Sequence, residues 1–335
     1  MSERVTILGA GSWGMAVSHL LAENGHEVIL WEHDPADLKK LRADRSNPDR
    51  LNGFRLSETV NVTGDLQASL VGAALVLLVV PSQFVRGVLI KASQFLSPDQ
   101  AIVSLAKGIE TSSLKRMTEV ISELTNHKPD ALAVLSGPSH AEEVVQDIPT
   151  TVVTASDSDE LAGRIQRLLS TSTFRVYQSD DVTGVELGGA LKNIIAIAAG
   201  IADGLGMGDN SKGALLTRGM AEITRLGVAC GARADTFAGL SGFGDLMTTC
   251  FSRHSRNRQV GEQISKGKTL EEILAGMTMV AEGVETTRSA LKLAEKSGVE
   301  MPITAEVHAV LFEGKNLAEA VNDLMGRKLR AEIWR

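Results

Sequence analysis

A glycine-rich turn near the N-terminus constrains the fold of this chain more than any other feature. Gly9, Gly11 and Gly14 follow a short β-branched run at residues 5–8 and precede a helical pattern at residues 15–23. In a dinucleotide-binding β-α-β unit, the first glycine permits the tight turn, the second lets a pyrophosphate approach the backbone, and the third lets the helix pack closely on the sheet. The G-x-G-x-x-G spacing is a weak signal alone, but its place between a strand and a helix is the context that dinucleotide binding requires.

The first half of the chain continues as apolar runs separated by helical segments. Besides residues 5–8, strands are predicted at 27–31, 74–80, 101–106, 132–135, 150–155 and 174–177. Short continuous apolar runs are typical of strands that are buried on both faces of a parallel sheet. The pattern therefore predicts an α/β fold over residues 1–183, a Rossmann-type doubly wound domain with a parallel sheet.

The second half of the chain changes character, because no strand is predicted from Glu186 onward. Helices are predicted at 184–205, 212–230, 257–266, 269–275, 283–297, 303–313 and 316–325, separated by glycines. We therefore expect an all-α C-terminal domain over residues 184–335 that carries the substrate-binding and catalytic groups. Because apolar helices are abundant in this domain, we also expect a homodimer that forms through it.

The overall composition excludes several classes of protein. The net charge of −7 argues against nucleic acid or an anionic membrane as the main partner. The longest apolar stretches, at residues 75–80 and 194–202, are far shorter than the roughly 20 residues that span a bilayer. Since the N-terminus lacks a signal-peptide pattern, we expect a cytoplasmic protein with no membrane insertion.

Cysteine and histidine spacing gives no sign of a metal site. The two cysteines, Cys230 and Cys250, form no C-x-x-C pair, so neither a disulfide framework nor a zinc site is indicated. No His-x-x-His or similar metal-binding spacing occurs among the seven histidines. We therefore predict no metal ligand, and a reducing compartment.

The residues after the second predicted strand bear on the choice between NAD and NADP. Glu32 or Asp34 could hydrogen-bond the ribose hydroxyls, which favours NAD, whereas His33 could lie beside a 2′-phosphate, which favours NADP. Asp34 is followed by Pro35, and this pair is also typical of a helix N-cap with proline at the first helical position. We favour the capping role for Asp34.

Two lysines and an aspartate are candidates for the chemistry. Lys107 follows the predicted strand at 101–106, at the kind of strand end where open α/β sheets bind ligands. Lys192 lies within a nearly all-apolar helical segment, so we expect it to be buried. Burial lowers the pKa of a lysine toward neutrality, which suits proton transfer. Asp245 ends the glycine-flanked turn at 242–245 and presents a carboxylate there.

A phosphate group is the expected anchor of the substrate. Residues 248–258 contain three arginines, a histidine, hydroxyls and an amide. Guanidinium groups and the free N–H groups at a helix N-terminus are good phosphate ligands. The alternatives are a solvated charged loop or a nucleic-acid patch, and the acidic balance of the chain argues against the second.

These motifs together resemble the NAD(P)-dependent glycerol-3-phosphate dehydrogenases, soluble enzymes of the bacterial type. The resemblance spans essentially the whole chain. Its marks are residues 9–14, 80–83, 106–108, 137–139, 191–193, 200–206, 242–246 and 255–258. The resemblance implies an enzyme that reduces dihydroxyacetone phosphate to sn-glycerol 3-phosphate for phospholipid synthesis, with NAD or NADP as cofactor.

The resemblance also implies roles for residues at matching positions. Lys192 resembles the family's proton donor and acceptor, and Lys107 and Asp245 resemble its polar partners at the reacting oxygen. The implied substrate contacts are Lys107, Gly137, Ser139, Lys192, Asp245, Ser255, Arg256 and Asn257. The implied cofactor contacts are Gly9, Gly11, Ser12, Trp13, Gly14, His33, Lys107, Ala141, Arg256 and Glu282. Glu32 departs from the small neutral residue that family members often have, which weakens the expectation of a strong NADP preference.

Two other functions fit parts of this pattern. A β-hydroxyacid or 6-phosphogluconate-type dehydrogenase shares a Rossmann domain, a helical second domain and a catalytic lysine followed by asparagine. Asp245 and the arginine-rich segment favour a phosphate monoester over a substrate with a carboxylate. A regulator that senses dinucleotides without catalysis would not need Lys107, Lys192 and Asp245 together.

Overall fold

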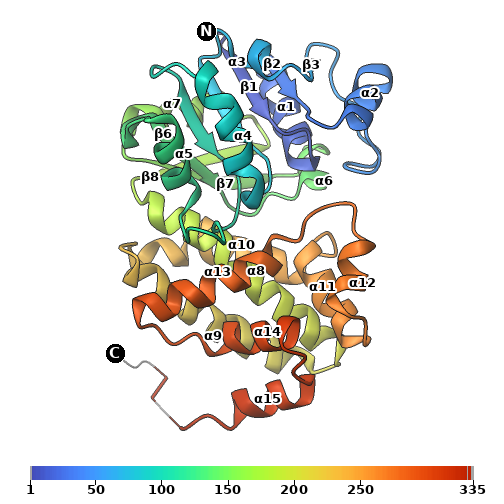
Figure 1. Cartoon of the computed structure of the whole chain (residues 1–335), viewed down its shortest axis with the longest axis vertical. Helices are drawn as coiled ribbons and strands as arrows, with labels where there is room; N and C mark the ends of the chain where they lie inside the picture. Colours follow the sequence, from blue (N-terminus) through green and yellow to red (C-terminus); the bar gives the residue numbers. More distant parts are fainter. Residues whose placement is uncertain (1, 330, 333–335) are drawn as a thin grey trace.

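The computed structural model describes residues 2–329, 331 and 332 of the chain. Two regions lie one above the other in Figure 1: a β-sheet flanked by helices, which holds the first half of the chain, and a group of helices below it. The long helix α8 (Val182–Gly204) begins the second region directly after the last strand.

The first region is built on one sheet. Its strands are β1 (Arg4–Leu8), β2 (Glu27–Trp31), β3 (Asn61–Thr63), β4 (Leu75–Leu78), β5 (Ala101–Ser104), β6 (Leu132–Ser136), β7 (Thr150–Ser156) and β8 (Phe174–Ser179). They lie in the order β3-β2-β1-β4-β5-β6-β7-β8. This order, with helices between successive strands (Figure 1), confirms the predicted Rossmann-type doubly wound fold.

One pair of neighbouring strands departs from the predicted parallel sheet. β6 and β7 pair antiparallel, with Ser136 opposite Val153, whereas the other pairs among the described strands are parallel. The segment between them contains one short helix, α6 (Ala141–Val144). A parallel crossover usually needs a helix that runs back along the sheet. A helix of about one turn cannot make that return.

Helices cover the sheet and have identifiable starts. They are α1 (Ser12–Glu23), α2 (Pro35–Asp44), α3 (Leu66–Leu70), α4 (Val85–Ala92), α5 (Met117–Thr125) and α7 (Asp159–Leu169). At the start of α2, the carboxylate of Asp34 accepts hydrogen bonds from the backbone N–H groups of Ala36 and Asp37 at 2.8 and 2.9 Å. The predicted capping role of Asp34, with Pro35 at the first helical position, is confirmed.

The regular secondary structure of the second region is helical throughout its described residues, as predicted. After α8 it contains α9 (Gly208–Ala229), α10 (Asp245–Phe251), α11 (Arg256–Ser265), α12 (Leu270–Ala275), α13 (Glu282–Ser297), α14 (Pro302–Phe312) and α15 (Leu317–Met325). No strand follows β8 in the described part of the chain. The boundary at residues 183 and 184 stays a prediction.

Helix α8 packs against α11 with the two backbones in direct contact. A Cβ atom at Gly200 would lie 2.0 Å from the carbonyl oxygen of Arg258, and one at Gly261 would lie 2.0 Å from that of Ile197. Larger residues at these positions would force the helices apart. The close contact fixes α8 relative to the N-terminal half of α11, and both helices contribute to the candidate site.

Helix α8 is longer than the apolar stretch within it. By length and composition it is the one helix in the described residues that could cross a membrane. This contradicts the expectation that no apolar segment of the chain is long enough to do so. However, 94% of its most apolar 18-residue window is buried inside the protein. A helix that is apolar on all sides and buried by its neighbours is typical of a core helix.

Candidate active site

The glycine turn has the geometry that a dinucleotide needs. Gly9 adopts a φ of +114°, and its N–H donates to the carbonyl of Trp31 at 3.1 Å. A Cβ atom at Gly14 would lie 1.9 Å from the carbonyl oxygen of Gly9, so α1 packs directly on the turn. A Cβ atom at Gly11 would meet no described atom within 4 Å. Space is therefore open at the second glycine, where a pyrophosphate would approach.

The N-terminus of α1 is suited to an anion. Its first turn has no acidic residue, and no side-chain hydrogen bond caps it. The free N–H groups and the positive end of the helix dipole favour phosphate at such a position. Both features fit a dinucleotide whose pyrophosphate is held by residues 9–14.

Three further predicted cofactor residues lie in or next to this turn. The hydroxyl of Ser12 donates to the carbonyl of Arg50 at 2.5 Å, which ties the turn to the loop after α2. Trp13 packs partly buried against the core, with its ring 6.3 Å from that of Phe174. His33 follows β2 and has a largely exposed side chain. Their roles as cofactor contacts stay predictions.

The three predicted catalytic residues come from distant parts of the sequence and meet in the structure. Lys107 follows β5, Lys192 lies in α8, and Asp245 begins α10. The Nζ atom of Lys107 lies 2.8 Å from Oδ2 of Asp245, and the Nζ atom of Lys192 lies 2.9 Å from Oδ1. One carboxylate therefore holds both ammonium groups.

Thr249, which lies in the segment 248–258 but is not among the predicted catalytic or substrate residues, completes this group. The hydroxyl of Thr249 accepts a hydrogen bond from Nζ of Lys192 at 2.6 Å and donates one to Oδ1 of Asp245 at 3.0 Å. Thr249 lies four residues after Asp245 on α10, and residues with this spacing share one face of a helix. That spacing is the signal that could have identified it.

Burial and charge pairing set the protonation of this group. Lys192 is 5% exposed and Asp245 is 2% exposed. Loss of hydration lowers the pKa of Lys192 to about 8, although the Asp245 carboxylate opposes this. Burial alone would raise the pKa of Asp245, but the ammonium groups of Lys107 and Lys192 hold it below its usual value. At neutral pH the site therefore holds a carboxylate between two ammonium groups, and Lys192 can exchange its proton readily.

The segment after β6 anchors Lys107. Gly137 has a φ of +133°, and its carbonyl accepts hydrogen bonds from Nζ of Lys107 at 2.8 Å and from the hydroxyl of Ser139 at 3.0 Å. Burial, reinforced by nearby ammonium groups, lowers the pKa of His140 to about 4, so its imidazole is neutral at physiological pH. Ala141 is buried at the first position of α6. The predicted substrate residues Gly137 and Ser139 therefore lie beside the lysine–aspartate group.

The N-terminus of α11 provides free backbone donors for an anion. Ser255 is the N-cap residue, and its hydroxyl accepts a hydrogen bond from the N–H of Arg258 at 3.2 Å. Arg256 and Asn257 occupy the first two helical positions, where backbone N–H groups have no partner within the helix. The structure therefore assigns the Ser255 side chain to capping and leaves backbone N–H groups available for a phosphate.

The side chain of Asn257 links this helix end to helix α8, next to Lys192. Its Nδ2 donates to Oδ1 of Asn193, the neighbour of Lys192, at 2.8 Å, and its Oδ1 accepts from the N–H of Gly283 at 2.8 Å. The amide is thus engaged on both sides by the protein. A phosphate contact by Asn257 would therefore use its backbone N–H, with the side chain setting the distance between α8 and α11.

Glu282, a predicted cofactor contact, joins the two regions of the protein. Its carboxylate accepts hydrogen bonds from the backbone N–H of Ser82, at 2.8 Å, and from the Ser82 hydroxyl. Burial raises the pKa of Glu282. Nearby, the guanidinium of Arg256 donates to the carbonyl of Val280 at 2.8 Å. Residues 280–282 are thus held by α11 on one side and by the turn after β4 on the other.

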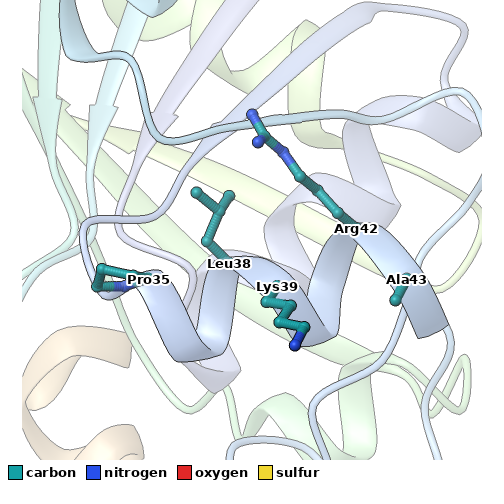
Figure 2. Close-up of a pocket in the computed structure, with 5 residues that line it drawn as sticks. All are labelled: Pro35, Leu38, Lys39, Arg42 and Ala43. Atoms are coloured by element: carbon teal, nitrogen blue, oxygen red, sulfur yellow. The ribbon is translucent and has the colours of Figure 1, made fainter.

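Two other features contain none of the predicted site residues. A hollow of about 410 Å³ runs along α2 (Figure 2), and its lining consists of Pro35, Leu38, Lys39, Arg42 and Ala43. The imidazole of His19 and the carboxylates of Glu23 and Asp147 have potential ligand atoms within 4.8 Å of one another. The absence of a metal from the active site stays a prediction.

The fold and the site together define an NAD(P)-dependent oxidoreductase with a Rossmann domain and a helical second domain. The chain belongs to the NAD-dependent glycerol-3-phosphate dehydrogenase family, whose N-terminal model matches residues 4–162 and whose C-terminal model matches residues 181–322.

Relatives and solved structures agree with this membership. The chain is 51% identical to a glycerol-3-phosphate dehydrogenase (NAD(P)+) of Citrifermentans bemidjiense, over 99% of both chains. It is 50% identical to one of Geobacillus thermodenitrificans, over 99% of this chain and 97% of that one. The crystal structure of glycerol-3-phosphate dehydrogenase from Coxiella burnetii superimposes with a TM-score of 0.94 at 37% identity, covering 97% of this chain and 99% of that chain.

Proposed function

We propose that this chain reduces dihydroxyacetone phosphate to sn-glycerol 3-phosphate with NADH or NADPH, in the cytoplasm, as a supply of precursors for phospholipid synthesis. The observation that carries the proposal is the pairing of Lys107 and Lys192 with the single carboxylate of Asp245. Asn193 and Asn257 link this group to the N-terminus of α11. Such an arrangement provides for a reacting carbonyl at one end and a phosphate at the other.

The two lysines are arranged to hold one substrate oxygen. An ammonium group has three N–H donors. Lys192 directs two toward Thr249 and Asp245, and Lys107 directs two toward Gly137 and Asp245. One N–H remains on each lysine for the C2 oxygen of the substrate. Two preorganised positive groups would stabilise the charge that develops on that oxygen, and Lys192 would deliver the proton.

The cofactor supplies a hydride to C2 of the substrate when it is bound. Residues 9–14 would hold its pyrophosphate over the N-terminus of α1. The bond between Glu282 and Ser82 would keep the two domains at a fixed separation around the reacting groups. Fixed geometry of this kind contributes to rate, because it aligns the reactants before the chemical step.

We also propose a homodimer that forms through the helical domain, with no nucleic-acid partner and no insertion into membranes. Support for the dimer comes from large apolar side chains that are exposed on helices of this domain, namely Val228, Phe251, Leu274 and Met325. The net charge of −7 disfavours polyanionic partners. The burial of α8 within the protein supports a core role for its apolar surface.

The test of the proposed reaction is the absorbance at 340 nm. Adding dihydroxyacetone phosphate to the protein with NADH, and then separately with NADPH, should give a fall in absorbance that stops when the substrate is consumed. A β-hydroxyacid dehydrogenase would leave this substrate unreacted and would instead reduce NAD(P)+ with a 3-hydroxy acid. A protein that senses dinucleotides would bind NADH and show no turnover with any substrate. Either result would overturn the proposal.

Arg256→Ala is expected to raise the KM for dihydroxyacetone phosphate by about 10- to 100-fold with a smaller effect on kcat, since one charged donor to the phosphate is lost. Initial rates over a range of substrate concentrations measure both constants. Arg253→Ala is the matched control, because Arg253 is an exposed arginine of the same segment outside the predicted set. An unchanged KM in Arg256→Ala would remove Arg256 from the phosphate site.

A further inference from the structure

We propose that Glu32 makes this enzyme prefer NAD(H) to NADP(H), because its carboxylate lies where the 2′-phosphate of NADP would have to bind. The inference deepens the proposed function and rests on its cofactor class, not on its substrate. It follows from where Glu32 lies, how its carboxylate is held and which charges surround it.

The position of Glu32 is set by the pairing of β1 with β2. Leu8 lies opposite Trp31 at the ends of these parallel strands, and the carbonyl of Trp31 accepts a hydrogen bond from Gly9. Glu32 is therefore the first residue after β2 and stands beside the glycine turn. In dinucleotide-binding folds an acidic residue about 20 positions beyond the glycine motif hydrogen-bonds the ribose 2′-hydroxyl. Glu32 falls at that distance from Gly14.

The carboxylate of Glu32 is fixed in place. The backbone N–H of Glu32 donates to the carbonyl of Thr63 at 3.0 Å, and its Oε1 accepts a hydrogen bond from the N–H of Asp34 at 2.8 Å. The residue is 6% exposed. No hydrogen bond in the described residues uses Oε2, which leaves that oxygen to accept from a ribose hydroxyl. Because the Glu32 carboxylate is buried and held by this hydrogen bond, it cannot rotate into solvent and would repel a 2′-phosphate.

Two arginines near this turn are engaged by other groups of the protein. Arg50 pairs with Asp37 at 2.9 Å and donates to the carbonyl of Thr278 at 2.7 Å. The two cations Lys39 and Arg42 line the hollow along α2 (Figure 2), where Arg42 donates to a backbone carbonyl of β3.

His33 is the remaining basic group at the end of β2. Its Nδ1 lies 3.0 Å from Oε1 of Glu32. The imidazole of His33 therefore already contacts the Glu32 carboxylate. The end of β2 therefore presents a buried, fixed carboxylate at the place where a 2′-phosphate would have to bind.

The experiment compares binding of NADH and NADPH to the wild type and to Glu32→Gln, by nicotinamide fluorescence without any substrate. The wild type should bind NADH at least about 10-fold more tightly than NADPH. Glu32→Gln removes the charge and keeps a hydrogen-bond acceptor, so NADPH affinity should rise about 10-fold or more while NADH affinity changes by less than about threefold. The ratio of kcat/KM for the two cofactors should shift in the same direction.

Asp34→Asn is the matched control. It removes an acidic charge two residues away and retains the acceptor oxygen that caps α2, so the preference for NADH should persist. Glu32→Asp keeps the charge and should also keep the preference. Equal affinity of the wild type for both cofactors, or an unchanged ratio in Glu32→Gln, would overturn the inference. Because binding is measured without substrate, a failure of the proposed reaction would show separately, as NADH preference with no turnover of dihydroxyacetone phosphate.

Discussion

Replacing Lys192 with methionine is expected to lower kcat for dihydroxyacetone phosphate by about 1,000-fold, within the range of about 10² to 10⁴ that a positioned general acid contributes. Methionine retains an apolar stem within the buried α8 but has no proton to donate. The C2 oxygen would also lose one of the two ammonium groups that offset its developing charge. Steady-state rates at saturating substrate measure kcat. NADH binding, followed by fluorescence, should change little because the glycine turn is untouched.

A second buried lysine provides the matched control for this substitution. Lys212 lies in α9, is 8% exposed, and pairs with the carboxylate of Asp203 at 2.9 Å. Lys212→Met therefore removes a buried ammonium group from the same domain without altering the pair of Lys192 and Asp245. Its loss of kcat should be far smaller than that of Lys192→Met. Turnover of Lys192→Met above about a tenth of the wild-type value would exclude Lys192 as the acid–base group.

The strands of the first domain are predictable where their sequence is continuously apolar. Two such strands, Leu75–Leu78 and Leu132–Ser136, are buried along their whole length, and their mostly apolar composition predicts this burial. β3 was missed because Asn61–Thr63 is a three-residue edge strand with one buried side chain, too short for a pattern. The strand β7 was predicted at 150–155 but its antiparallel direction was not, because strand direction depends on the connection, here the short α6 segment, and not on the strand's own sequence.

The charged members of the candidate site are visible in the sequence, but their contacts are not. Lys192 stands out as a charge in an apolar helix, and Asp245 stands out between glycines. Their contact with Lys107 depends on how two helices of the second domain, α8 and α10, pack against strand ends of the first. Asn257 illustrates the limit: the sequence suggested a phosphate ligand, whereas its side chain is bonded to Asn193, 64 residues away. Such pairings arise from tertiary packing that no local pattern encodes.

Asp245→Asn is expected to shift the pH dependence of the reaction to lower pH. Only the ammonium form of Lys192 can protonate the substrate oxygen, so the rate of reduction should be flat below the pKa of about 8 and fall above it. The Asp245 carboxylate raises this pKa, whereas burial and the Lys107 ammonium lower it. Without the carboxylate, burial and the Lys107 ammonium still lower the pKa of Lys192. The pH at which the rate of reduction falls should therefore decrease by about one unit or more. Profiles of kcat/KM between pH 6 and 10 measure the shift, because this interval brackets the pKa of Lys192 in the wild type and in the variant.

The reverse reaction distinguishes a change in proton transfer from a merely damaged site. Oxidation of sn-glycerol 3-phosphate needs the neutral amine of Lys192, so its rate should rise with pH to a plateau near the same pKa, and Asp245→Asn should move this rise to lower pH as well. A structural defect would reduce both rates without moving either profile. Asp203→Asn removes another carboxylate that pairs with a lysine, from the same helix as Lys192, and should leave both profiles in place. Unshifted profiles in Asp245→Asn would show that Asp245 does not set the protonation of Lys192, even if the variant were slow.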